Sequence, residues 1–334
     1  MAAETLEFED ALVPLLKELD ALAALPRTDA RNREIDLLSR KLHNARVEIY
    51  SRLTPWQRVL VARHPSRPDM LDYCARLFTD FVELHGDRRF ADDGAIVCGF
   101  ARYHGAPVMV CGHQKGRDMK QKVQRNFGYA RPEGYRKALR AMQMADKFGR
   151  PIIVFVDTPA AYPGVESEER GIAEAIALNL REMAIISVPI IVVITGEGGS
   201  GGALGLAIGD RVLMQEFAVY SVIPPEGCAA ILWRDPSRKV EAAEALKITA
   251  PDLIARGIVD GVVDEPLGGA HQDADVAAAA VDLAVSAALA EVAALDAATR
   301  LQTRYDRFRR LGALGDAIID TAAPAAATPT RAER

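Results

Sequence analysis

Residues 188–204, VPIIVVITGEGGSGGAL, combine a run of apolar residues with a glycine-rich turn and the start of a short helix. The turn matches two unrelated patterns. GEGGSG at 196–201 fits the dinucleotide fingerprint, and GGSGG at 198–202 fits the nucleophile elbow of serine hydrolases. A third interpretation needs no side chain, because a strand that turns into a helix directs backbone N–H groups outward.

The serine interpretation needs a base near Ser200. His271 is the only histidine after that serine, and Asp260 or Asp264 could complete the triad order. However, His271 lies in the loop sequence GGAHQD, which gives it little support. The dinucleotide interpretation lacks the acidic residue expected about 20 positions later. A P-loop is excluded because no Lys-Ser or Lys-Thr pair follows the glycines.

The backbone interpretation fits best. We expect the N–H groups of Gly201, Gly202 and Ala203 to form an oxyanion hole at the helix start, where negative charge on a substrate oxygen is stabilised. Gly198 and Gly199 are expected to let the substrate approach the backbone. The alternative is a turn that only packs a strand against a helix.

A second unusual turn, DTPAAYPG at 157–164, follows the preceding apolar strand. In an open α/β sheet, ligands bind outside the carboxyl ends of the strands, so both turns are expected at one edge. We expect Gly164 and Arg170 to contact substrate there. The alternative for Arg170 is an ion pair with Glu166 or Glu174.

Apolar strands that alternate with helices predict a parallel or mixed sheet covered on both faces. Strands are expected at 95–103, 107–113, 151–157, 188–195, 212–222 and 258–263, and helices at 132–148, 168–185, 201–209 and from 273 to about 297. The expected organisation is a helical N-terminal extension (1–55), a main α/β domain (56–300), a C-terminal helical end (301–317) and a tail of disordered composition (318–334).

The composition argues against several classes of function. The formal net charge of −5 over 334 residues argues against general nucleic-acid or membrane-surface binding. Four scattered cysteines favour free thiols over a metal site. The start MAAETLEFEDALV lacks the features of a signal peptide, and no uninterrupted apolar run approaches the ~20 residues that span a bilayer. A cytoplasmic protein is therefore expected.

One segment of the chain is basic, although the net charge of the whole chain is negative. Residues 115–125, KGRDMKQKVQR, carry Lys115 and Arg117, which are expected to line a groove that attracts the phosphates of a substrate or the surface of a partner. The alternative is a solvated face with no ligand.

Several long motifs, taken in order, resemble the alpha subunits of bacterial acetyl-CoA carboxylase carboxyltransferase over roughly residues 5–315. They are GHQKG (112–116), RPEGYRKALRAMQMA (131–145), DTPAAYPGVESEERG (157–171), GEGGSGGALGLAIGD (196–210), YSVIPPEGCAAILW (220–233) and EPLGGAH (265–271).

The resemblance implies a crotonase-like α/β fold of repeated ββα units. It implies transfer of a carboxyl group from carboxybiotin, held on the biotin carboxyl carrier protein, to acetyl-CoA. The product is malonyl-CoA, in the first committed step of fatty acid biosynthesis. The implied partners are a beta subunit in an α2β2 complex, the carrier protein and, in the whole ATP-dependent complex, biotin carboxylase. The zinc of this family belongs to the beta subunit, so no metal is expected in this chain.

The resemblance also implies that the turn at Gly201, Gly202 and Ala203 serves the biotin oxygen, while the beta subunit serves the acetyl enolate. Two positions depart from the family pattern, Ala160 in place of glycine and Glu166 in place of a small residue. An alanine that needed a positive φ would strain and shift the turn.

Two other interpretations stay open. A crotonase-like acyl-CoA enzyme that acts without a partner would use side-chain acids and bases, for which Glu197 and Glu226 are the candidates. A non-catalytic scaffold would use the turns for structure only.

Overall fold

The computed structural model describes residues 5–312, so the expected tail at 318–334 lies outside the described residues. Its centre is a single mixed sheet in the order β1-β2-β3-β4-β5-β6-β8, with β7 paired to β5. β1, β2 and β3 are antiparallel, and the pairs from β3 onward are parallel. The strands are β1 Phe78–Glu83, β2 Ile96–Tyr103, β3 Ala106–His113, β4 Ile152–Thr158, β5 Ile190–Gly199, β6 Arg211–Gln215, β7 Val219–Ser221 and β8 Gly261–Val263.

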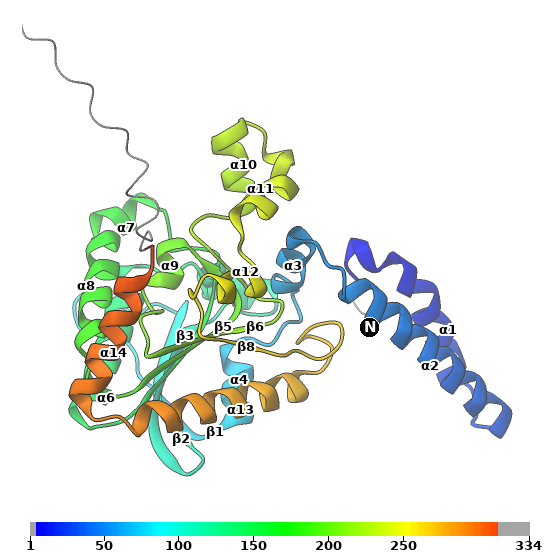
Figure 1. Cartoon of the computed structure of the whole chain (residues 1–334), viewed down its shortest axis with the longest axis horizontal. Helices are drawn as coiled ribbons and strands as arrows, with labels where there is room; N and C mark the ends of the chain where they lie inside the picture. Colours follow the sequence, from blue (N-terminus) through cyan, green and yellow to red (C-terminus); the bar gives the residue numbers. More distant parts are fainter. Residues whose placement is uncertain (1–4, 313–334) are drawn as a thin grey trace, which may run out of the picture.

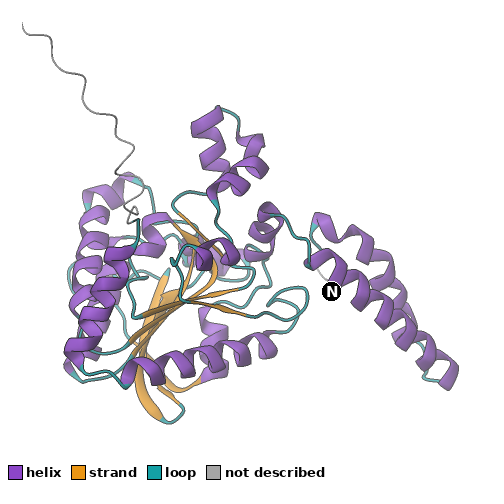
Figure 2. Ribbon diagram, viewed as in Figure 1, coloured by secondary structure: helices purple, strands orange, loops and turns teal. Residues whose placement is uncertain are grey.

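The central strands are apolar on both faces because both faces are covered by helices (Figure 2). Along β4, Ile152 and Val154 face one core, while Ile153 and Phe155 face the other. The first core lies under α6 Pro132–Lys147, α8 Ile172–Ile185, α9 Ser200–Leu204 and α12 Ala250–Ala255. The second lies under α4 Met70–Leu77 and α13 Ala274–Ala293. This confirms the predicted mixed sheet with two covered faces.

Two helical segments project from this body (Figure 1). The first is the expected N-terminal hairpin, with η1 Glu7–Leu12, α1 Val13–Ala23 and α2 Asp29–Tyr50. Tyr50 anchors its base, since its ring packs edge-on against Phe217 and its hydroxyl donates to Glu9 at 3.0 Å. The second projection holds α10 Pro225–Trp233, η3 Pro236–Arg238 and α11 Lys239–Leu246. No pattern in the sequence predicted this second projection.

The shorter elements lie around the edge of the sheet. They are α3 Pro55–Ala62, α5 Met119–Gln124, η2 Asn126–Gly128 and α7 Val165–Glu169. The expected helix at 168–185 is divided, because Gly171 adopts a left-handed φ of 77° between α7 and α8. The expected strand at 212–222 is likewise divided into β6 and β7.

The last two described helices are α13 and α14 Ala297–Arg310. Of the described helices, α13 alone is long and apolar enough to cross a membrane by length and composition. One face of α13 is buried on the sheet through Val281, Val285 and Val292, as expected of a helix that covers a core.

Candidate active site

The two segments expected to be turns lie side by side at one edge of the sheet, although β5 continues through 196–199 and its backbone turns only at Ser200. β4 and β5 are parallel neighbours, and Thr158 pairs with Gly198 at their carboxyl ends. Beyond that pair, Ala161 forms an isolated bridge with Ala130. The structure therefore confirms that both turns reach the same edge, where open α/β sheets bind ligands.

The glycines allow the two turns to touch. A Cβ added at Gly199 would lie 1.8 Å from the Pro159 carbonyl oxygen, and one at Gly202 would lie 2.4 Å from the Ala161 nitrogen. Real Cβ atoms do not come this close to a neighbouring backbone. These two glycines are thus required by the contact between the turns, whether or not a substrate also approaches them.

Other glycines of this edge make room for side chains. An added Cβ would lie 2.7 Å from the Tyr220 ring at Gly198 and 2.3 Å from the Tyr162 ring at Gly164. Gly201 differs, because its nearest neighbour would be a methyl carbon of Ile176 at 3.7 Å. In the glycine turn, therefore, Gly201 is the position with open space beside it.

That open space is a cavity of about 280 Å³ between α9, β7 and α12. Leu204, Tyr220, Leu253 and Ile258 supply most of its wall, and Ser200 and Gly201 form part of its rim. No side chain caps the start of α9. The N–H groups of Gly201 and Gly202, in the first turn of α9, also lack acceptors within the helix, whereas that of Ala203, one position further on, has its acceptor inside α9. A substrate group with an apolar body and a negatively charged oxygen could therefore pack against the apolar cavity wall and accept hydrogen bonds from these N–H groups.

The serine-hydrolase interpretation lacks its base. Ser200 does adopt a strained left-handed φ of 50°, as an elbow nucleophile would. No histidine or carboxylate lines its cavity among the described residues. His271 instead stacks on His64, with ring centroids 3.7 Å apart, and Asp260 is paired with Arg307 at 2.8 Å.

The two departures from the family pattern cause no distortion of the turn. Ala160 does not adopt a positive φ, so alanine brings no left-handed strain there. Glu166 lies in the first turn of α7, and its carboxylate folds back toward Gly164.

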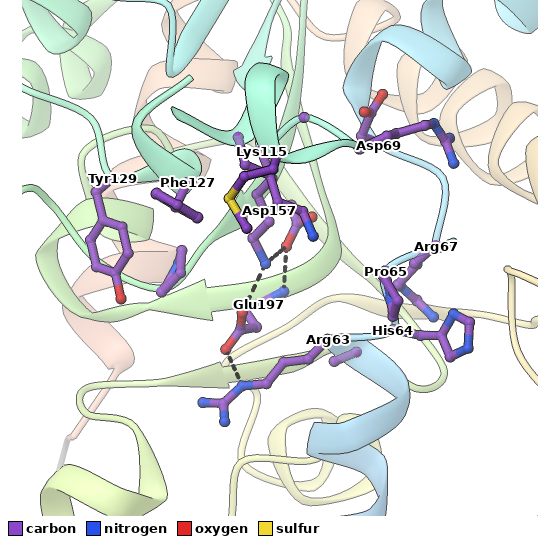
Figure 3. Close-up of a pocket in the computed structure, with 16 residues that line it drawn as sticks. Arg63, His64, Pro65, Arg67, Asp69, Lys115, Phe127, Tyr129, Asp157 and Glu197 are labelled. Atoms are coloured by element: carbon purple, nitrogen blue, oxygen red, sulfur yellow. Dashed lines mark hydrogen bonds and ion pairs between the residues drawn. The ribbon is translucent and has the colours of Figure 1, made fainter. Parts of the chain in front are cut away.

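Behind the turns lies a five-residue ion network, of which Figure 3 labels all members except Glu226. The Lys115 ammonium contacts the carboxylates of Asp157 at 2.7 Å and Glu197 at 2.8 Å. Arg63 contacts Glu197 at 2.6 Å from the opposite side and also reaches Glu226 at 2.6 Å. The network therefore ties the ends of β4 and β5 to α3 and to the first turn of α10.

This network decides against side-chain acid–base chemistry by the two glutamates. Burial alone would raise the pKa of Glu197, but Lys115 and Arg63 lower it to about 2. Burial also opposes the charge of Glu226, but the hydrogen bond and charge of Arg63, together with a backbone hydrogen bond, lower its pKa. Both groups are ionised and paired near neutral pH, so neither resembles the general acid that an enzyme acting alone would need.

Lys115 and Arg117 border a larger cavity of about 420 Å³ that Met119, Lys122 and Phe127 also line. Burial opposes the charge of Lys115, yet the two carboxylates raise its pKa to about 12. Arg117 is paired with Asp72. Both cations therefore already have partners, and sequence reasoning missed those partners because they come from distant elements.

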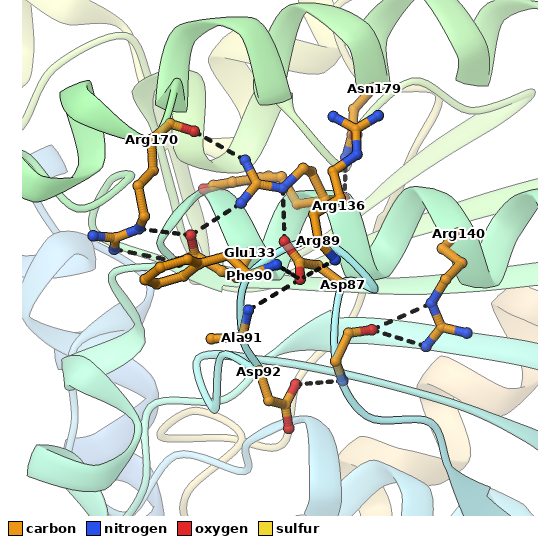
Figure 4. A network of polar contacts seen from close by, with 12 residues as sticks. Asp87, Arg89, Phe90, Ala91, Asp92, Glu133, Arg136, Arg140, Arg170 and Asn179 are labelled. Carbon is orange, nitrogen blue, oxygen red and sulfur yellow. Dashed lines mark hydrogen bonds and ion pairs between the residues drawn. The ribbon is translucent and has the colours of Figure 1, made fainter.

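Arg170 lies at the same edge, in a separate polar network (Figure 4). Its guanidinium donates to Glu133 at 2.7 Å and stacks over the Phe90 ring at 4.8 Å. Glu133 also accepts a bond from Arg136 at 3.0 Å. The alternatives considered from sequence, Glu166 and Glu174, were wrong as the principal partner, because the carboxylate comes from α6.

Metal ligands do not gather at this edge. Across residues 5–312, no group of three or more His, Cys, Asp or Glu side chains is placed to hold a metal ion. The four cysteines are buried and free.

Comparison with known proteins places these features in a family. Residues 5–312 match the model of the acetyl co-enzyme A carboxylase carboxyltransferase-like family. The acetyl-coenzyme A carboxylase carboxyl transferase subunit alpha of Geobacter metallireducens is 56% identical over 307 residues, which cover 92% of this chain and 96% of that protein. The subunit of the same name from Sorangium cellulosum is 55% identical, with 93% and 99% covered.

Solved structures agree on the fold. Transcarboxylase 12S, crystallised with methylmalonyl-coenzyme A and methylmalonic acid, superposes with a TM-score of 0.56 at 24% identity, over 68% of this chain and 42% of that one. The beta subunit of geranyl-CoA carboxylase from P. aeruginosa gives a TM-score of 0.50 at 19% identity, over 64% and 42%. The chain thus spans less than half of these larger carboxyltransferase chains. The crotonase-like fold expected from the sequence is confirmed.

Proposed function

Because the chain belongs to the family of acetyl-CoA carboxylase carboxyltransferase alpha subunits, which take part in forming malonyl-CoA from acetyl-CoA, we propose that its glycine turn is an oxyanion hole for the carboxyl-donor side of that reaction. The donors are the N–H groups of Gly201 and Gly202, while the Ala203 N–H, which was also expected to contribute, is used within α9. Their target is the ureido oxygen of biotin, which gains negative charge when the carboxyl group leaves. Preformed donors of this kind stabilise such charge without reorganisation.

The apolar cavity beside Gly201 supports this assignment. Its 280 Å³ and its Tyr220, Leu253 and Ile258 walls suit the apolar sulfur-containing ring of biotin, with the oxygen of the fused ureido ring turned toward the start of α9. Carboxybiotin would arrive on the biotin carboxyl carrier protein, after biotin carboxylase has loaded it. The proton removed from acetyl-CoA can pass to the biotin anion, so the ion-paired state of Glu197 and Glu226 is no obstacle.

The remaining predicted contacts are proposals of the same kind. Gly164, Gly198 and Gly199 shape the edge through their close neighbours, and the substrate contact predicted for them remains untested. For Arg170, the Glu133 pair leaves one guanidinium edge available for a substrate or carrier carboxylate. Lys115 and Arg117 contribute positive charge to the larger cavity, although their carboxylate partners offset much of it.

The second half of the reaction is assigned to a partner. We infer a zinc-containing beta subunit of similar fold that supplies the oxyanion hole for the acetyl enolate, in an α2β2 complex in the cytoplasm. The apolar surface next to the cavity supports a partner at this edge, since Val222 is 76% exposed, Ile231 71% and Leu232 64%. The last two residues lie on α10, the projecting helix whose first turn joins the ion network.

The observation that carries the oxyanion proposal is the position of Gly202, which holds the turn against Ala160 and Ala161. Gly202→Ala would force these backbones apart and rotate the N–H groups at the start of α9. Loss of one oxyanion donor costs about 3–4 kcal/mol, so we expect a fall in kcat of about a hundred- to a thousandfold. The assay is malonyl-CoA-dependent carboxylation of free biotin by the complex with the beta subunit.

Gly209→Ala is the matched control. A Cβ there would lie 2.8 Å from a Val192 methyl carbon and 3.0 Å from the Ile190 carbonyl, so this glycine is also crowded, though less tightly than Gly202, at the opposite end of the strands. Both variants should lose stability, but only Gly202→Ala should lose catalysis. Equal kcat values for the two variants, in complexes of normal size by gel filtration, would show that the turn only packs.

A further inference from the structure

The end of α9 opposite the glycine turn is held by two buried polar side chains. The Tyr135 hydroxyl, on α6, donates to the Gly202 carbonyl at 3.2 Å. The Asn179 amide, on α8, donates to the Gly205 carbonyl at 3.1 Å and to the backbone carbonyl of Tyr135 at 3.1 Å. Tyr135 and Asn179 are fully buried. Two neighbouring helices thus fasten a helix of only five residues.

The Tyr135 bond replaces one that the helix itself cannot make. In a longer helix, the Leu206 N–H would donate to the Gly202 carbonyl, but here it donates to Ala203 at 3.1 Å. The aromatic ring fits closely as well, since a Cβ added at Gly205 would lie 2.9 Å from it. Position 205 therefore also needs a glycine so that the tyrosine can reach α9.

Holding this carbonyl matters for the oxyanion hole because α9 is so short. The Ala203 N–H, which shares the peptide unit of the Gly202 carbonyl, comes after the first four N–H groups and has its acceptor within α9. The N–H groups of Gly201 and Gly202 are the ones left without an acceptor in the helix. A donor that fixes the Gly202 carbonyl fixes the orientation of this turn and therefore the direction of these two groups.

We propose that Tyr135 is a positioning residue of the carboxyltransferase reaction, which keeps the N–H groups of Gly201 and Gly202 directed at the substrate oxygen by holding the Gly202 carbonyl. This inference rests on the proposed oxyanion function and adds to it a residue that does not itself touch substrate. Burial raises the pKa of the Tyr135 hydroxyl well above its usual range, so the hydroxyl stays a donor at neutral pH. Asn179 supports the same helix one turn further on.

Tyr135→Phe tests the proposal because it removes the donor and keeps the ring. The matched control is Tyr73→Phe, which removes another buried hydroxyl, bonded to Gln215 at 3.0 Å in the other core. Both variants lose one neutral hydrogen bond, so their melting temperatures should fall by similar amounts. In the complex with the beta subunit, we expect kcat of Tyr135→Phe to fall about tenfold below that of Tyr73→Phe. The KM values for malonyl-CoA and free biotin should stay within about twofold, since the aim of a donor matters most in the transition state.

Hydrogen exchange gives a second readout that does not depend on turnover. The peptide covering 200–205 should exchange faster in Tyr135→Phe than in Tyr73→Phe, because α9 has lost one of its fastenings. Asn179→Ala should act in the same direction and repeats the test with a second residue.

Equal kcat values and equal exchange for Tyr135→Phe and Tyr73→Phe would overturn the positioning role. That result is distinct from failure of the oxyanion proposal, which is decided by Gly202→Ala against Gly209→Ala. If kcat falls in Gly202→Ala but not in Tyr135→Phe, the oxyanion proposal stands and only the positioning role of Tyr135 is rejected.

Discussion

Ser200 has a left-handed backbone, with φ of 50°, directly after the close-packed glycines. Its side chain faces an apolar cavity without a base, and the proposed donors are backbone groups. We therefore expect Ser200→Ala to keep kcat within about threefold, because it changes no N–H group. A nucleophile or an assisting base would be worth about a hundredfold or more. The comparison is made in the assembled complex with the same biotin assay.

Ser200→Gly is the companion variant. Glycine adopts φ of 50° without a Cβ penalty, so this variant should melt at a higher temperature than Ser200→Ala by an amount equivalent to about 1 kcal/mol. A hundredfold loss of kcat in both variants would reinstate the hydroxyl as a reacting group.

At this scale, the sequence predicted the position of the site better than the reason for its glycines. Gly199 was expected to let a substrate approach and Gly202 to donate its N–H group, whereas the atoms that come closest to these two glycines are those of Pro159 and Ala161. The two turns are about 40 residues apart, and no local pattern shows that they touch. The ion pair of Arg63 with Glu197 escaped prediction for the same reason, since its members are 134 positions apart.

Among the elements, prediction succeeded where proline or glycine bounds an apolar run. The strand expected at 151–157 is Ile152–Thr158, and the helix expected at 132–148 is Pro132–Lys147. It failed where the backbone turns inside a continuous pattern, as at Gly171. The expected helix at 201–209 ends at Leu204, because the chain turns there to begin β6.

The last described helix, α14, is held to the body by arginines rather than by an apolar stripe. Arg304 is 1% exposed, contacts both carboxylate oxygens of Asp210 at 2.9 and 2.7 Å, and donates to the carbonyls of Met183 and Ile186. Arg304→Met would leave Asp210 charged, buried and without its guanidinium partner. We expect the free energy of unfolding to fall by about 3–5 kcal/mol, measured by urea denaturation.

Arg309→Met is the control on the same helix, since Arg309 is exposed. A surface change of this kind should alter stability by no more than about 0.5 kcal/mol. An Arg304→Met variant as stable as Arg309→Met would mean that the buried ion pair gives no net support to the docking of α14.

At the scale of the whole molecule, ion pairs link the proposed site to the projecting helix α10. Arg63 holds Glu197, at the end of β5, and Glu226, in the first turn of α10. A partner that binds α10 would therefore contact a helix that is linked through Arg63 to β5, the strand that leads into the glycine turn. An open site on one subunit, next to an exposed apolar surface, fits a reaction that two subunits share.

The surface itself provides the final prediction, which concerns assembly. Ile231 and Leu232 are 71% and 64% exposed on α10, and burying such side chains in an interface contributes roughly 1.5–3 kcal/mol each. We expect the double variant Ile231→Ser/Leu232→Ser to weaken binding of the beta subunit by about a hundredfold or more, measured by titration calorimetry. Leu283→Ser is the control. Leu283 is 76% exposed on α13, which lies on the other side of the sheet from α10 (Figure 1). The double variant should melt like the parent chain on its own, since neither side chain is buried there. If it binds the beta subunit as tightly as Leu283→Ser does, the partner docks elsewhere and the apolar face of α10 has another role.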